Sequence, residues 1–217
     1  MQKVINLILD LLFPQTCMGC NKKGSILCDS CVYSIRRAER ETNKDIVAIY
    51  DYRDPIIKRA IWNLKYYKQK YIGKILGQIL YEAFIEDIAD IKVLSGGLPI
   101  IVIPVPLSKT KKKTRGYNQA EIIANSFVNC AKNTDLELNT DTINKNIDTT
   151  PQARITNRNK RLRNVHGAFK ILRPDLVIGR TFIIIDDVTT TGGTITEIIK
   201  ILKLSKAKKV IGLAIAH

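Results

Sequence analysis

The chain has 217 residues, of which 45% are hydrophobic and 25% are charged, and its formal net charge is +15 with a pI of about 9.7. This composition excludes a disordered or collagen-like chain, and it supplies enough residues for one core domain with a small appendage. The positive charge is clustered, which favours a polyanionic partner, although a basic solvated face would have the same net charge.

The first fourteen residues, MQKVINLILDLLFP, predict a short amphipathic helix that ends at Pro14. Asn6 and Asp10 interrupt its apolar stripe, and the stripe is too short to span a bilayer. We therefore expect a helix that docks on the protein itself, in a cytoplasmic chain without a secretory signal or a transmembrane segment. Peripheral contact with a membrane surface is the alternative, for which only Lys3 supplies a basic flank.

Four cysteines follow in the segment CMGCNKKGSILCDSC, at Cys17, Cys20, Cys28 and Cys31. Two Cys-x-x-Cys pairs can present four thiolates to one ion, and a closed tetrahedral thiolate shell is typical of structural zinc. Disulfides or a redox pair are the alternative, which the absence of a secretory signal disfavours. The spacing therefore predicts a structural zinc module. Cys130 stands apart in a helical pattern as a small apolar residue, and no role is assigned to it.

Beyond the cysteines, strand and helix patterns alternate along the chain. Apolar residues at helical spacing predict helices over residues 30–37, 55–67, 72–89, 117–132 and 194–204. Runs rich in β-branched residues predict strands over residues 45–52, 100–105, 138–143, 182–185 and 209–215. This alternation predicts an α/β fold with a parallel sheet. We expect an N-terminal helix and zinc module over residues 1–40 and the main domain over residues 41–217.

The most informative segment is TFIIIDDVTTTGGT, residues 181–194. Its apolar run predicts a central strand covered on both faces, and open α/β sheets bind ligands at the carboxyl ends of their strands. Small hydroxyls and backbone N–H groups suited to a phosphate dianion would come from Thr189, Thr190, Thr191, Gly192, Gly193 and Thr194. Asp186 and Asp187 would repel a phosphate, so they are predicted to accept hydrogen bonds from ribose hydroxyls or to help hold Mg²⁺ through water. The spacing describes a ribose 5-phosphate site.

Two basic segments flank apolar runs. They contain Lys109, Lys111, Lys112, Lys113 and Arg115, and then Arg154, Arg158, Lys160, Arg161 and Arg163. In a parallel sheet both would lie in loops beside the same ligand crevice. A pyrophosphate needs only two or three cations, so about ten also indicate a larger polyanion such as a nucleic-acid strand. Lys109 and Arg115 are the candidates for pyrophosphate. The candidates for nucleic acid are Lys111, Lys112, Lys113, Arg158, Arg161 and Arg163.

The segment at 181–194 resembles the PRPP-binding motif of the type I phosphoribosyltransferases, in which two acidic residues meet the ribose hydroxyls and a Thr/Gly loop wraps the 5-phosphate. Together with the cysteine module, VPLSKTKKKTRGYNQAEIIA (105–124), TPQARITNRNKRLRNVHGAF (150–169) and LKYYKQK (64–70) are similar to the ComF competence proteins. The resemblance implies a type I phosphoribosyltransferase fold behind a zinc module, in a cytoplasmic protein of DNA uptake. If the domain is catalytic, it implies that pyrophosphate is displaced from C1 of PRPP with Mg²⁺, with Asp186 and Asp187 holding the ribose.

Two hypotheses stay open. The first is an enzyme that transfers phosphoribose to an unidentified acceptor, with nucleobase salvage as its alternative form. The second is a non-catalytic protein that binds PRPP or a nucleotide as a sensor and holds incoming single-stranded DNA, with other DNA-uptake proteins as candidate partners. Stacking on bases would then fall to residues that equally suit a core or a helix surface: Tyr66, Tyr67, Tyr71 or Tyr117. His166 and His217 are expected to be structural or incidental, and Lys65 is a candidate either for nucleic-acid contact or for exposure to solvent.

Overall fold

The computed structural model describes residues 15–39, 45–131, 136–146 and 166–217. The described helices are α2 (Asp29–Ser34), α3 (Pro55–Tyr66), α4 (Lys70–Ser95), α5 (Lys109–Arg115), α6 (Gln119–Cys130), α8 (Gly193–Leu204) and the 3₁₀ turn η2 (Pro174–Leu176). The strands are β1 (Ile46–Tyr50), β2 (Ile100–Pro104), β3 (Leu136–Leu138), β4 (Ile143–Lys145), β5 (Phe169–Ile171), β6 (Thr181–Val188) and β7 (Lys209–Ala216). The helix predicted over residues 1–14 and the second basic segment lie outside the described residues.

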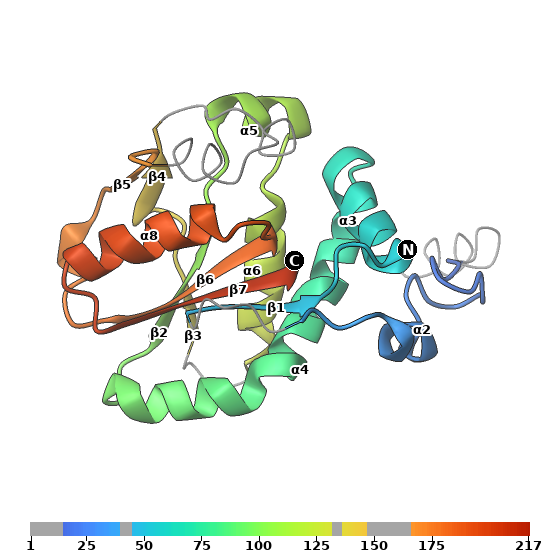
Figure 1. Ribbon diagram of the computed structural model, residues 1–217, viewed down its shortest axis with the longest axis horizontal. Coiled ribbons are helices and arrows are strands. Elements are labelled where there is room, and N and C mark those ends of the chain that lie inside the picture. The colour runs from blue at the N-terminus through green and yellow to red at the C-terminus, as the bar shows by residue number, and fades with distance from the viewer. Residues whose placement is uncertain (1–14, 40–44, 132–135, 147–165) are drawn as a thin grey trace, which may run out of the picture.

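A five-stranded sheet in the order β1-β7-β6-β2-β3 forms the centre of the fold, and all its pairings are parallel, as predicted (Figure 1). β6 is the central strand, and its apolar residues are buried on both faces. Ile183 and Ile185 pack in a core with α3, α4 and α6, while Phe182 and Ile184 pack in a second core with α8. Because both faces are covered, the strand reads as a continuous apolar run instead of an alternating one.

The chain reverses its direction of winding between β2 and β6. From β2 it passes through α6 to β3 on one side, whereas from β6 it passes through α8 to β7 on the other side. Open α/β sheets bind ligands in the crevice outside the carboxyl ends of the strands at such a point. Here the carboxyl end of β2 leads toward α5, and that of β6 leads into the Thr/Gly loop before α8.

Three elements differ from the sequence prediction. The first basic segment is the helix α5 instead of a loop, because Ser108 caps its first turn and Gly116 ends it at a φ of +80°. In place of one strand near 138–143 there are two, of which β3 extends the parallel sheet and β4 pairs antiparallel with β5. α4 continues past residue 89 because Ile88 and Ile91 are still buried, and it ends where Gly96 takes a φ of +71°.

α4 has 26 residues, a length that would suffice to cross a bilayer. Charged side chains interrupt its surface, among them Glu82, Glu86, Asp87 and Asp90. None of the described helices is both long and apolar enough to span a membrane.

Two glycines allow α4 and α6 to pack very closely. A Cβ at Gly77 would lie 2.4 Å from the Ile123 carbonyl oxygen and 2.6 Å from the Ser126 Cβ, and one at Gly73 would lie 2.7 Å from Ile122. The Ser126 hydroxyl also donates a 2.6 Å hydrogen bond to the Lys74 carbonyl across this contact. The absence of two side chains therefore sets the distance between these helices.

Gly77→Ala is expected to destabilise the protein by about 1–3 kcal/mol, because the added methyl group meets a backbone that cannot rotate away. In an exposed helix the same change would stabilise by about 1 kcal/mol, so the sign of the effect is diagnostic. Urea unfolding measures it, with Gln78→Ala on the exposed face of α4 as the control, expected within about 0.5 kcal/mol of wild type. A Gly77→Ala protein as stable as wild type would contradict the close packing.

Candidate functional site

The two aspartates lie near the carboxyl end of β6, which continues past the predicted apolar run to Val188. Asp187 is only 7% exposed, and its backbone N–H donates a 2.9 Å hydrogen bond to Asp186 Oδ1. Burial, and after it the charge of Asp187, raises the pKa of Asp186 to about 7. The strand end therefore crowds negative charge and favours a cation or a hydrogen-bond donor.

Lys65, in the last turn of α3, supplies one such cation. Its Nζ lies 3.0 Å from Asp187 Oδ2, and its side chain is 18% exposed. Of the two roles considered from the sequence, exposure to solvent does not describe this position, and contact with nucleic acid stays a prediction. The contact with Asp187 was not predicted, because nothing in a helical pattern reveals that its last turn meets a strand more than a hundred residues away.

Lys111 on α5 belongs to the same charged cluster. Burial, and then the positive charges of Arg115 and Lys65, lower the pKa of Lys111, while the carboxylates of Asp186 and Asp187 oppose that shift. Predicted as a nucleic-acid contact, Lys111 is partly buried and lies within electrostatic reach of the acidic pair. The structure thus gathers positive charge from α3 and α5 around the end of β6.

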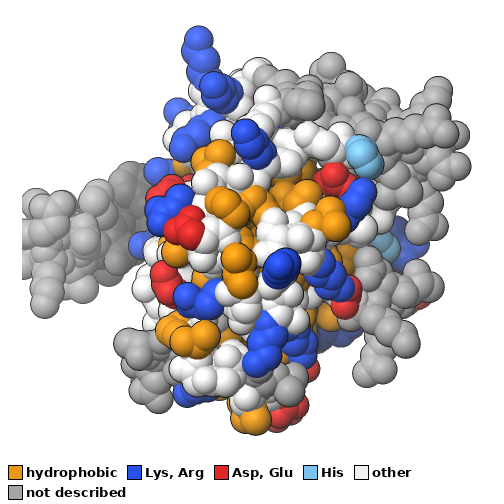
Figure 2. Space-filling model, turned by 90° about the vertical axis from the view of Figure 1, so that its left-hand side faces the viewer, with side chains coloured by type: hydrophobic (Ala, Val, Ile, Leu, Met, Phe, Trp, Pro, Cys, Tyr) orange, Lys and Arg blue, Asp and Glu red, His pale blue; other side chains and the backbone are white. Residues whose placement is uncertain are grey.

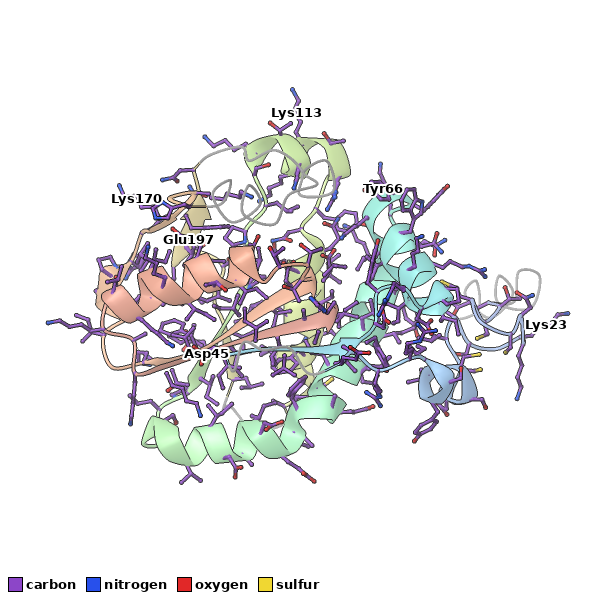
Figure 3. All side chains as sticks on the ribbon, viewed as in Figure 1. Lys23, Asp45, Tyr66, Lys113, Lys170 and Glu197 are labelled. Carbon is purple, nitrogen blue, oxygen red and sulfur yellow. The ribbon has the colours of Figure 1, made fainter. Side chains whose placement is uncertain are left out.

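The other predicted basic residues of α5 have different surroundings. Arg115 donates a 2.7 Å hydrogen bond from Nη1 to Gln119 Oε1, and its guanidinium carbon lies 5.6 Å from the centre of the Tyr66 ring. Lys109, Lys112 and Lys113 are exposed, and Figure 3 shows Lys113 pointing away from the sheet. On the face drawn in Figure 2, Lys and Arg side chains are dispersed among hydrophobic and uncharged ones.

The Thr/Gly loop between β6 and α8 forms a cradle. Gly192 has a φ of +71°, and a Cβ there would lie 3.1 Å from Ile46 Cδ1, so the position requires glycine. The Thr189 N–H donates 2.9 Å to the Ala216 carbonyl, and the His217 Nε2 lies 2.6 Å from the Thr190 carbonyl oxygen. These contacts hold the loop against β7, and of the structural or incidental roles expected for His217 they favour the structural one.

A buried hydroxyl in this loop is unsatisfied. Among the described residues, no group hydrogen-bonds Thr191 Oγ1, although the atom is buried. Of the five buried side-chain atoms in the described residues that have no hydrogen-bond partner, it is the one that lies in this loop, where a bound group could satisfy it. Beside it, the first turn of α8 presents backbone N–H groups without helical partners. An anion such as a phosphate fits both features.

Exposed aromatic rings stand on α3 and at the start of α4, next to this site. Trp62 and Tyr66 have ring centroids 4.5 Å apart, and both are at least half exposed, as are Tyr67 and Tyr71. Tyr117 differs, because it is partly buried and its hydroxyl donates to the Leu64 carbonyl. Tyr117 therefore joins the start of α6 to α3, whereas the other three tyrosines are open to a ligand.

The four predicted cysteines come together. The sulfur atoms of Cys17, Cys20, Cys28 and Cys31 lie within 4.8 Å of one another, with Cys17 Sγ 3.6 Å and Cys20 Sγ 3.7 Å from Cys28 Sγ. A tetrahedral ion with metal–sulfur bonds of about 2.3 Å places its sulfur ligands about 3.8 Å apart. Although burial opposes it, hydrogen bonds from backbone N–H groups lower the pKa of Cys17 to about 6. The cluster is compatible with a structural metal ion.

The cysteine cluster packs against α3, the helix that carries Lys65. The Arg59 Nη1 donates a 2.6 Å hydrogen bond to the Met18 carbonyl, between the first two cysteines. A Cβ at Gly19 would lie 2.6 Å from Cys31 Sγ and 2.9 Å from Ile56 Cδ1, so this contact also needs a glycine. Cys130 lies elsewhere, half-buried at the end of α6, where burial raises its pKa.

Much of this chain is similar in sequence to known proteins. The family model described as phosphoribosyl transferase domain matches residues 82–217. The chain is similar to DNA utilization protein YhgH of Escherichia coli O157:H7, at 29% identity over 160 residues that cover 72% of this chain but only 65% of the relative. It is also similar to competence protein F of Haemophilus influenzae, at 29% identity over 199 residues that cover 86% and 83% of the two chains. The predicted resemblance to the competence proteins is confirmed.

Two solved structures also match. Hypoxanthine-guanine phosphoribosyl transferase of L. donovani has a TM-score of 0.41 at 13% identity, over 67% of each chain. Hypoxanthine phosphoribosyl transferase of Trypanosoma cruzi has a TM-score of 0.41 at 11% identity, over 65% of this chain and 64% of the other.

Asp186→Asn is expected to change how stability depends on pH. Because the pKa of Asp186 in the folded protein is about 7 and its ordinary value is 3.8, the folded chain keeps a proton that the unfolded chain releases between these values. Stability of the wild type therefore falls as pH rises from about 4 to about 7, by at most about 4 kcal/mol, and the variant lacks this loss.

Urea unfolding across that pH range, in a chelator of divalent cations, measures the difference. The advantage of Asp186→Asn over wild type should grow up to about pH 7 and then level off. Asp90→Asn, on the exposed surface of α4, serves as the control and should show no such growth. A difference that is constant with pH would contradict the raised pKa of this carboxyl.

Proposed function

Because this chain belongs to the phosphoribosyl transferase domain family, we propose that the carboxyl edge of its sheet binds PRPP with Mg²⁺ and that the protein handles single-stranded DNA during DNA uptake. One observation carries the proposal for the ligand. The acidic pair at the end of β6 is followed by a cradle that combines the unsatisfied Thr191 hydroxyl with the start of α8, at the point where the sheet reverses its winding. A ligand with a phosphate next to a diol matches this sequence of groups.

In this proposal each part of PRPP has its own residues. The 5-phosphate lies in the Thr/Gly loop, on Thr189, Thr190, Thr191, Gly192, Gly193 and Thr194. The ribose hydroxyls meet Asp186 and Asp187, and the pyrophosphate faces α5, where Lys109 and Arg115 were predicted to hold it and Lys111 lies partly buried. Lys65 forms an ion pair with Asp187. When PRPP binds, this ion pair must either break or leave room for the ribose hydroxyls on Asp187.

The same arrangement suits transfer of phosphoribose. The bond between C1 of the ribose and the pyrophosphate oxygen breaks, its electron pair leaves with the pyrophosphate, and a lone pair of the acceptor forms the new bond to C1. Arg115, which its hydrogen bond to Gln119 holds in place, stabilises the charge that grows on the leaving group, together with Lys109 and the partly buried Lys111. Mg²⁺ bound with PRPP would supply further charge neutralisation at the pyrophosphate and ribose oxygens. The acidic pair orients the sugar.

The competence and DNA utilization relatives support the second part of the proposal. The match covers only 65% of the Escherichia coli relative. We therefore base the proposed role in DNA uptake on this similarity together with the positive charge of the chain. A reduced four-cysteine cluster suits the cytoplasm, where we place the protein. Other DNA-uptake proteins are the partners expected there.

We further propose that residues 1–40 form a module stabilised by one structural Zn²⁺ and that residues 41–217 form the phosphoribosyltransferase domain. All four ligands would be the thiolates of the cysteine cluster, with no open position. Zinc then acts on folding and takes no part in the chemistry at the sheet edge.

Calorimetric titration with PRPP should show binding that requires Mg²⁺. Asp186→Asn/Asp187→Asn is expected to weaken it by at least about a hundredfold, because each hydrogen bond to a charged group contributes about 1.5–3 kcal/mol. Asp87→Asn/Asp90→Asn, on the exposed face of α4, removes the same charge and should bind like wild type. Failure of the folded wild type to bind PRPP with Mg²⁺ would refute the site.

Zinc content and thermal stability test the cysteine cluster. The purified protein is expected to hold one zinc per chain, and removal by a chelator should lower the Tm, because metal binding is coupled to folding. Cys17→Ser/Cys31→Ser should lose the metal, whereas Cys130→Ser should keep it and serves as the control. Metal-free wild type with an unchanged Tm would rule out a structural metal.

A further inference from the structure

A groove of about 770 Å³ runs along one side of α6, and its lining includes no residue of the acidic pair or the Thr/Gly loop. Its floor is the capping residue Asn118 and a stripe of α6 residues at helical spacing, from Glu121 to Cys130. Lys70 and Lys74 of α4 form one wall, and Lys112 of α5 stands at one end. The groove is thus a second concave surface, separate from the candidate ligand site.

Positive charge prevails in this groove. Lys70, Lys74 and Lys112 line it, against one acidic residue, Glu121. Within the described part of the chain, none of these three lysines takes part in an ion pair. Lys70 and Lys74 are one helical turn apart on the same face of α4, so they supply successive positive charges along the groove. A row of cations suits a ligand whose negative charges repeat along its length.

The floor of the groove offers hydrogen bonds without charge. Asn125 and Asn129 are exposed, lie one turn apart on α6 and line the groove. Each amide has two donor hydrogens and one acceptor oxygen, so it can meet the polar edge of any base. Ser126 lies between them, but its hydroxyl is already bonded to the Lys74 carbonyl. Cations on the wall and amides on the floor correspond to the two parts of a nucleotide chain.

Tyr117 connects the groove to the candidate ligand site. Its ring lines the groove and lies 5.0 Å from Lys70 Nζ, while its hydroxyl donates to the Leu64 carbonyl, next to Lys65. The ring holds Lys70 by a cation–π contact, which fixes one end of the row of lysines. A strand lying in the groove therefore passes close to the helix that reaches the acidic pair.

We propose that the groove between α4 and α6 holds a segment of single-stranded nucleic acid, with phosphates on Lys70, Lys74 and Lys112 and base edges on Asn125 and Asn129. This assignment rests on the proposed handling of single-stranded DNA and identifies the surface that would bind it. It differs from the prediction based on the basic segment. That prediction named Lys111, Lys112 and Lys113, and among these only Lys112 lines the groove. Since the amides can donate or accept, the groove should tolerate any base.

Fluorescence anisotropy with a labelled oligothymidylate, at a series of salt concentrations, tests the groove. In Lys70→Gln/Lys74→Gln the slope of log K against log salt should be shallower by about 1.4, because each phosphate contact on a single strand contributes about 0.7. Lys58→Gln/Lys208→Gln removes the same charge from exposed positions outside the groove and should leave the slope near that of wild type. Asn125→Ala/Asn129→Ala should weaken binding with no change of slope.

Several outcomes separate the groove from the proposed function. If the wild type binds the oligonucleotide and the groove variant matches its control, the groove assignment fails while DNA handling stands. If the folded wild type does not bind even at low salt, both fail, and PRPP calorimetry still reports on the ligand site alone. Equal competition by polyglutamate would overturn the nucleic-acid assignment in favour of an acidic protein partner. Unchanged PRPP binding by the groove variant supports two separate sites.

Discussion

The contact between Lys65 and the acidic pair of β6 is the interaction on which the arrangement of this site depends. Two carboxylates at the end of a buried strand are unfavourable unless a cation or hydrogen-bond donors meet them. The compensating charge comes from α3, with Lys111 of α5 nearby. These helices are far apart in sequence, so the acidic pair draws together segments that secondary structure alone would not bring into contact.

The sheet is held between two apolar cores. The cores on the two faces of the sheet are almost entirely aliphatic, and close contacts at Gly73 and Gly77 bring α4 against α6. A few buried polar atoms of the described residues have no hydrogen-bond partner. The Thr191 hydroxyl is one of these, and it lies in the loop that follows the acidic pair.

The sequence predicted those features whose residues are close together in the chain, and it did not predict contacts between distant segments. β6 and the Thr/Gly loop were predictable because the apolar run, the acidic pair and the glycines are contiguous. The cysteine cluster was predictable because the spacing between its cysteines is short. Lys65 meeting Asp187 is a contact between distant segments, and no local pattern encodes it. The helix α5 was missed because five cations in seven residues suggest a loop, whereas the Ser108 cap and the Gly116 end settle the conformation. The strand expected near 138–143 is two strands because its halves pair with different sheets.

α3 is a wall shared by two places that could each hold an ion. Its first half contacts the cysteine cluster through Ile56 and Arg59, and its last turn places Lys65 on Asp187. Any ligand at one end that shifts this helix changes the free energy of binding at the other. Thermodynamic linkage then requires the effect to be mutual, so that the proposed metal would change the affinity for the proposed phosphorylated sugar by the same factor as the sugar changes the affinity for the metal. In that case the cysteine module, besides its structural role, would also affect the affinity of the carboxyl edge of the sheet for its ligand.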